Sequence, residues 1–310
     1  MKSILPRLKP LIRWVILGAS VFFLVGILRQ NWRNVTSLHL DGAGWACLAI
    51  ALGITLSAHI CAGWVWSQTL RRDFQQLVDS GQIIQAYLQT NIAKYLPGNI
   101  WHYYGRINAA TAAGASLEAA TVTVLLEPLL MAAAALLVGL SANQTVIAYG
   151  TVGLWLQWLG LVSVLLAIHP RAINPVIAYL SRLKQKTARS SENTLSVRLL
   201  HYPVLPLLGG LGFLLLRGGG FLITFWAIAP FNIGQVPLLL SGFSLSWLIG
   251  LLVPGAPGGI GVFEATAIAL LSHDFQAGLL LGVVALYRLV SVTSEAMGAG
   301  LAWLDEQMNH

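Results

Sequence analysis

The chain has 310 residues, of which 56% are hydrophobic and only 9% are charged, and its formal net charge is +7. About a quarter of the residues in a soluble globular domain are charged, so this composition excludes a soluble globular protein and indicates an all-α polytopic membrane protein. The positive charge does not indicate nucleic-acid binding, because the Lys and Arg residues gather in loops beside apolar stretches, where they orient spans and attract anionic lipid headgroups.

Six apolar stretches have the length of about 20 residues that a spanning helix needs. The first follows a basic segment and lacks a clear cleavage site, so we expect residues 1–42 to form an uncleaved signal-anchor helix and an outer loop. The expected spans are Leu11–Leu28, Ala43–Leu70, Leu117–Leu140, Val146–Ile168, Leu205–Ile228 and Gln276–Leu304.

Two further apolar segments, Gly81–Asn108 and Val236–Ser272, are interrupted by proline and glycine. Proline lacks an N–H and glycine has little preference for helix, so each segment is predicted to be a broken or re-entrant helix. Irregular backbone at membrane depth is tolerated where protein covers it or where it lines a wet cavity, and transporters bind substrates at such places. The sequence leaves open whether residues 236–272 form a hairpin or cross twice. The breaks supply these candidate binding residues: Pro97, Gly98, Pro254, Gly255, Pro257, Gly258, Gly259 and Gly261.

The distribution of Lys and Arg predicts that both termini lie in the cytoplasm, since Arg29 and Arg33 are the only basic residues of the outer loops. With this orientation, residues 43–140 and 205–304 run in opposite directions through the membrane. We expect them to be inverted repeats, joined by a linking helix at 146–168 and a basic cytoplasmic loop at 169–204.

Charged residues also lie at expected membrane depth, where they are costly and are usually functional or paired. They are Arg106, Glu127, Arg217, Glu264, Arg288 and Glu295. Two interpretations remain open: an ionic network that fixes the helix bundle, or a polar cavity for a charged headgroup or ion. His59 fits a hydrogen bond between helices better than a ligand role. The residues beside Trp101, which are His102, Tyr103 and Tyr104, fit either a headgroup site or interfacial anchoring.

No nucleotide-binding loop, nucleophile elbow or metal-ligand spacing is found in the sequence, so we expect no cofactor, no metal and no enzymatic activity.

The second break, Pro254-Gly255-x-Pro257-Gly258-Gly259-x-Gly261-Val262-Phe263-Glu264, closely resembles a signature of the lysylphosphatidylglycerol synthase transmembrane (flippase-like) family. Leu96-Pro97-Gly98 with Arg106 resembles the family's first signature, and Glu127 and Arg288 fall where the family has an acid and a base. The chain departs from the first signature at residues 101–105, where members often carry a Gly-Glu or Gly-Asp pair. The resemblance covers about residues 10–305 and implies a stand-alone transmembrane unit without the aminoacyl-transfer domain.

The resemblance implies translocation of a lipid or lipid-linked headgroup across a prokaryotic cytoplasmic membrane. The three arginines at membrane depth would contact phosphate, and the three glutamates would contact cationic groups or relay protons. The alternatives are an ion or solute transporter of the same architecture, a non-catalytic partner of a lipid-modifying or glycosyl-transfer enzyme, and a structural assembly factor. The sequence does not specify the oligomeric state.

Overall fold

A computed structural model describes residues 40–96, 100–142, 144–187, 197–253 and 256–308, which form helices and connecting loops without strands. The predicted span Leu11–Leu28 and the residues Pro97, Gly98, Pro254 and Gly255 lie outside the described residues. The long helices are α2 (Gly42–Gln68), α5 (Leu117–Gly139), α6 (Gln144–Ala167), α8 (Val204–Trp226), α9 (Val236–Leu252) and α11 (Ala277–Met308). The shorter ones are α3 (Ser80–Asn91), α4 (Trp101–Ala112), α7 (Pro170–Thr187) and α10 (Val262–Leu271).

Six of the described helical stretches are long and apolar enough to cross a membrane. Five of them coincide with predicted spans, because α2, α5, α6, α8 and α11 lie where the hydropathy placed them. The sixth, Ile233–Leu252, contains α9 and belongs to the second broken segment. The prediction of an all-α polytopic membrane protein is therefore confirmed.

Both broken segments are pairs of helices joined by irregular chain. In the first, α3 leads through the 3-10 turn η2 (Ile92–Tyr95) toward α4, and each of the two helices has 12 residues. In the second, α9 leads toward the turn η4 (Pro257–Gly259) and then α10, which has 10 residues. Helix α10 is shorter than the roughly 20 residues that a full crossing requires, whereas Ile233–Leu252, which contains α9, is long enough to cross. The turns η2 and η4 contact each other.

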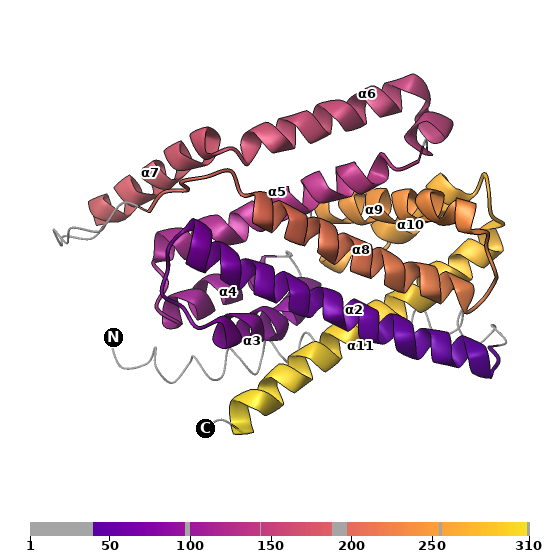
Figure 1. The fold of residues 1–310 in the computed structure, drawn as a ribbon, viewed down its shortest axis with the longest axis horizontal. Helices are drawn as coiled ribbons and strands as arrows, with labels where there is room; N and C mark the ends of the chain where they lie inside the picture. The colour runs from indigo at the N-terminus through magenta and orange to yellow at the C-terminus, as the bar shows by residue number, and fades with distance from the viewer. Residues whose placement is uncertain (1–39, 97–99, 143, 188–196, 254–255, 309–310) are drawn as a thin grey trace.

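The helices fall into two units, α2–α5 (residues 42–139) and α8–α11 (residues 204–308), which run in opposite directions (Figure 1). There α2 runs from right to left and α5 returns, whereas α8 runs from left to right and α11 returns. The hairpin α3–α4 joins α2 to α5 at one end of the bundle, and α9–α10 joins α8 to α11 at the other. The contacts between the units are reciprocal. Helices α2 and α3 of the first unit pack on α11 of the second, and helices α8 and α9 of the second unit pack on α5 of the first. This is the arrangement expected of inverted repeats.

Helices α2 and α8 form the most extensive helix contact of the bundle. Small residues allow it, because a Cβ on Gly209 would lie 2.3 Å from Val65 Cγ2 and one on Gly220 would lie 2.4 Å from Thr55 Oγ1. Helix packing in membranes depends on such close approach of backbones. The glycines that flank Arg217 therefore bring α8 against its neighbours and place the arginine inside the bundle.

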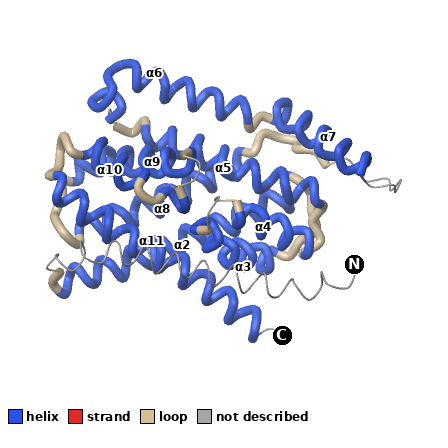
Figure 2. Tube along the Cα trace, turned by 180° about the vertical axis from the view of Figure 1, so that it is seen from behind, coloured by secondary structure: helices blue, strands red, loops and turns tan. Residues whose placement is uncertain are grey.

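The helices α6 and α7 lie along one side of the bundle, as Figures 1 and 2 show. Residues 169–204, predicted as a basic loop, contain the helix α7. This helix is amphipathic: Ile173 and Ile177 are buried, while Arg171 is exposed. The side chain of Asn174 holds the returning chain by bonding both the N–H (2.9 Å) and the C=O (3.0 Å) of Leu199.

Candidate functional site

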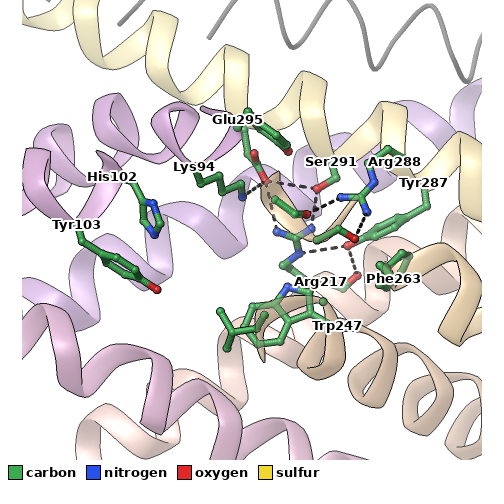
Figure 3. A pocket seen from close by; sticks show the side chains of 15 residues that line it. Lys94, His102, Tyr103, Arg217, Trp247, Phe263, Tyr287, Arg288, Ser291 and Glu295 are labelled. Atoms are coloured by element: carbon green, nitrogen blue, oxygen red, sulfur yellow. Dashed lines mark hydrogen bonds and ion pairs between the residues drawn. The ribbon is translucent and has the colours of Figure 1, made fainter. Parts of the chain in front are cut away.

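A cavity of about 100 Å³ lies where the two broken segments meet (Figure 3). Its volume exceeds the ~10–15 Å³ that a single water requires. Cations and aromatic rings dominate its wall, which is formed by Lys94, Tyr95, His102, Tyr103, Arg217, Trp247, Gly250, Leu251, Gly258, Gly259, Phe263, Tyr287, Arg288, Ser291 and Glu295. The two hairpins and the helices α8 and α11 all contribute residues to this wall, so the cavity lies between the two units.

The carboxylate of Glu295 is the centre of the charges at this cavity. Its Oε1 lies 2.7 Å from Lys94 Nζ and 3.5 Å from Arg217 Nη1. His59 Nε2 lies 3.4 Å from the same oxygen but makes no hydrogen bond to any of the described residues, and His59 is buried. The other oxygen, Oε2, is buried without a hydrogen-bond partner among the described residues. A single carboxylate therefore serves two cations from different elements, the buried Arg217 and the partly buried Lys94.

Arg217 is fixed by uncharged partners as well. Its Nη2 donates to Ser291 Oγ at 2.6 Å and its Nε to the Tyr287 hydroxyl at 3.2 Å. The same hydroxyl donates back to the carbonyl of Arg217 at 3.2 Å. These bonds hold the guanidinium in one position at the cavity wall (Figure 3).

Arg288 binds the second break. Its Nε donates to Glu264 Oε1 at 2.7 Å, and its Nη1 and Nη2 donate to the carbonyls of Gly258 and Gly259 at 3.0 and 3.3 Å. The arginine thus satisfies carbonyls that the irregular turn leaves without helical partners, which is how broken backbone becomes tolerable at membrane depth. Gly258 and Gly259 adopt φ values of 59° and 71°, a region that favours glycine.

The first hairpin has an ion pair of its own. Arg106 Nη1 bonds Glu127 Oε2, the Tyr87 hydroxyl donates to Glu127 Oε1 at 2.8 Å, and the Arg106 guanidinium lies 3.7 Å from the centre of the Tyr87 ring. Glu127 faces a separate cavity of about 20 Å³, room for about one water. This pair is not part of the wall of the larger cavity.

The two ion pairs occupy corresponding places with opposite polarity. Arg106 on α4 binds Glu127 on α5, whereas Glu264 on α10 binds Arg288 on α11. In each unit, the short helix after the break is therefore tied to the long helix that follows it.

A polar chain joins the two charged groups through the bundle. Asn91 Oδ1 accepts from Arg106 Nη2 at 3.4 Å, and Asn91 Nδ2 lies 3.4 Å from His59 Nδ1. His59 in turn contacts Glu295. Four of the charges predicted at membrane depth, Arg106, Glu127, Arg217 and Glu295, are thus connected, whereas Glu264 and Arg288 form a separate pair. Part of this ionic network borders the cavity.

The predicted candidate residues divide into three groups. Arg217, Gly258, Gly259, Arg288 and Glu295 line the cavity, with Glu264 held behind Arg288. Four others are not in the described wall: Arg106, Glu127, Gly261 and Glu264. Pro257 belongs to η4. Pro97, Gly98, Pro254 and Gly255 lie outside the described residues.

Sequence reasoning missed a role for Lys94, Trp247, Tyr287 and Ser291. Ser291 could have been found, because it lies on the helix face that carries Arg288 and Glu295, at spacings of three and four residues. Lys94 directly precedes the first break, yet its partner Glu295 is 201 residues away. No local pattern indicates that contact.

Buried arginines and a lysine beside aromatic rings can bind phosphate or another anion, since guanidinium groups offer several donors in fixed directions. The described residues hold no group of three or more His, Cys, Asp and Glu that could bind a metal ion.

The fold and this cavity define a polytopic α-helical membrane protein with a buried, cation-rich site between two broken helical segments. Comparison with protein-family models found no match for the chain, and comparison with curated proteins found none either.

Proposed function

We propose that this protein translocates a lipid or lipid-linked headgroup across the membrane and that the headgroup passes through the cavity between the two breaks. The observation that carries the proposal is the meeting of η2 and η4 at a cavity lined by Lys94, Arg217 and Arg288. Buried charges at membrane depth mark substrate pathways, and transporter sites lie between inverted repeats at broken helices.

The proposal extends to topology and setting. The protein acts in a prokaryotic cytoplasmic membrane with both termini in the cytoplasm, as the distribution of Lys and Arg favours. It acts without chemistry of its own, either alone or beside an enzyme that makes or modifies the lipid. The resemblance of the second break to the flippase-like signature supports the same class of substrate.

The test is lipid movement in liposomes that contain the purified full-length protein and a fluorescent phosphatidylglycerol. Quenching of the outer leaflet by a membrane-impermeant reductant measures how fast the inner lipids emerge. The wild type is expected to move the lipid, and the Glu264→Ala/Arg288→Ala double variant is expected to lose at least ~90% of the rate, because the wall at the second break loses both partners of its ion pair.

Equal rates for the wild type and the double variant would refute the assignment. Gly278→Ala on the same helix serves as a control, since a Cβ there meets nothing within 4 Å. Its rate is expected to equal that of the wild type. A protein that moves no lipid but carries a small anion or proton into the same liposomes would instead be a solute transporter.

A further inference from the structure

The charges around the cavity do not balance. Lys94, Arg217 and Arg288 line it, but Glu295 is the only carboxylate in the described wall. Arg288 is satisfied separately by Glu264 and two backbone carbonyls. Lys94 and Arg217 therefore share the single negative charge of Glu295. One positive charge remains in excess, and an uncompensated charge in a buried site is strongly unfavourable.

The two cations differ in how firmly they are held. Arg217 bonds Tyr287 and Ser291, which fix it whether or not Glu295 is present. Lys94 bonds Glu295 from the end of η2, next to the first break, and its side chain is 19% exposed. A lysine ammonium carries three donors on a flexible stem. It can turn to a second acceptor in the cavity without movement of the helices.

A further polar atom at the wall lacks a partner. His102 is 6% exposed and lines the cavity, and its Nδ1 is buried without a hydrogen-bond partner among the described residues. In Figure 3 its ring lies beside Tyr103, on the side of the cavity opposite Phe263. Buried polar atoms are nearly always bonded, so the unpaired nitrogen indicates a polar occupant.

We infer that the ligand of this cavity is a phosphate-ester anion without a balancing cationic group, and that it binds Lys94 and Arg217 by displacing the carboxylate of Glu295. Glu295 is then an internal counter-ion that offsets the repulsion between Lys94 and Arg217 until the ligand binds. The inference rests on the proposed function only in taking the phosphate to be that of the translocated lipid.

The opposite assignment makes Glu295 the binding partner of a cationic headgroup, such as an aminoacyl ammonium. That ammonium would have to bind Oε2, since Oε1 already contacts Lys94 and Arg217, and it would add a second positive charge to the excess. The two assignments predict opposite signs for the removal of the Glu295 charge. If the Glu295 carboxylate competes with the ligand, removing its charge strengthens ligand binding. If the carboxylate binds the ligand, removing its charge weakens that binding.

The experiment measures binding to the full-length protein in detergent, followed by tryptophan fluorescence because Trp247 lines the cavity. Short-chain phosphatidylglycerol is the anionic probe, short-chain lysyl-phosphatidylglycerol the cationic probe, and inorganic phosphate the free-anion probe. Glu295→Gln is expected to bind phosphatidylglycerol at least tenfold tighter than the wild type. Lys94→Gln is expected to bind it at least tenfold weaker.

Glu306→Gln is the matched control, because it removes the same charge from the same helix at a residue that bonds Gln89 outside the cavity wall. Its affinity is expected to equal that of the wild type. Weaker binding of lysyl-phosphatidylglycerol by Glu295→Gln, with unchanged or weaker binding of phosphatidylglycerol, would overturn the inference.

Lys94→Gln keeps the test decisive if Glu295→Gln does not fold. The lysine variant removes the excess charge and leaves Glu295 paired with Arg217, so it is expected to melt no lower than the wild type. Unchanged affinity of this variant for phosphatidylglycerol would also overturn the inference. Binding of inorganic phosphate as tight as that of the lipid would support the anion site and overturn a lipid as its source. Tight, Lys94-dependent lipid binding without lipid movement would support the anion site and refute translocation.

Discussion

Substitution of Gly258 by alanine tests whether the two breaks support each other. A Cβ at this position would lie 2.5 Å from Tyr95 Cε1 and 2.8 Å from Cδ1. Tyr95 is only 1% exposed, and apart from the cavity that it lines its ring is packed in the interior. The turn η4 would have to separate from η2, and the cavity between them would change shape.

The expected cost has two parts. Alanine at the φ of 59° that Gly258 adopts costs about 1–2 kcal/mol, and overpacking a filled interior costs about 1–3 kcal/mol more. Gly261 is the matched control, because its φ is 80° but a Cβ there meets nothing within 4 Å. Gly261→Ala is therefore expected to cost backbone strain alone, about 1–3 kcal/mol at its φ of 80° and ψ of −40°.

The assay is reversible unfolding in mixed micelles, followed by tryptophan fluorescence. Gly258→Ala is expected to lose more stability than Gly261→Ala, because only its Cβ meets Tyr95. Tyr95→Leu is expected to recover about 1–3 kcal/mol in the double variant, since contacting residues couple by such amounts. Equal losses at the two glycines, or strict additivity with Tyr95→Leu, would refute direct packing of the breaks.

Three further outcomes follow from the helix contacts. Gly209→Ala is expected to lower the unfolding free energy by about 1–3 kcal/mol, because its Cβ would lie 2.3 Å from a valine methyl of α2; Gly212→Ala, with open space around it, is expected to cost nothing when melted in parallel. Arg106→Glu and Glu127→Arg are each expected to lower the unfolding free energy by about 3–5 kcal/mol. The double variant, in which the two charges are exchanged, is expected to regain most of that loss, and no recovery would contradict the importance of the ion pair. Asn174→Ala is expected to cost about 1–3 kcal/mol locally and to speed proteolysis of residues 197–203; unchanged cleavage would contradict the anchoring role.

The spans could be predicted because hydropathy over about 20 residues is set by the bilayer itself. Ala43–Leu70 and Leu117–Leu140 correspond to α2 and α5 within a few residues. The breaks could be predicted for a similar reason, since proline and glycine interrupt a helix wherever they fall. Residues 169–204 were less predictable, because their basic composition obscured the apolar face of α7 that packs inward.

The site could be predicted only in part. Sequence reasoning identified costly charges such as Arg217 and Arg288, because any ionisable residue inside an apolar span is conspicuous. It could not pair them, since pairing depends on which helices meet. Arg288 and Glu295 share a helix face but bind different partners, and Glu264 rather than Glu295 completes the pair with Arg288.

The packing of the first unit on the last helix of the second also constrains the order in which the bundle assembles during synthesis. The first hairpin packs on α11, the last described helix. Lys94 is synthesised 201 residues before its partner Glu295. At about 5–20 residues per second, ribosomes need roughly 10–40 s to supply that partner. During this interval the growing chain holds an unpaired lysine near the membrane. Assembly of the bundle is therefore completed by its final helix, and a nascent chain that stops before Glu295 has no counter-ion for that lysine.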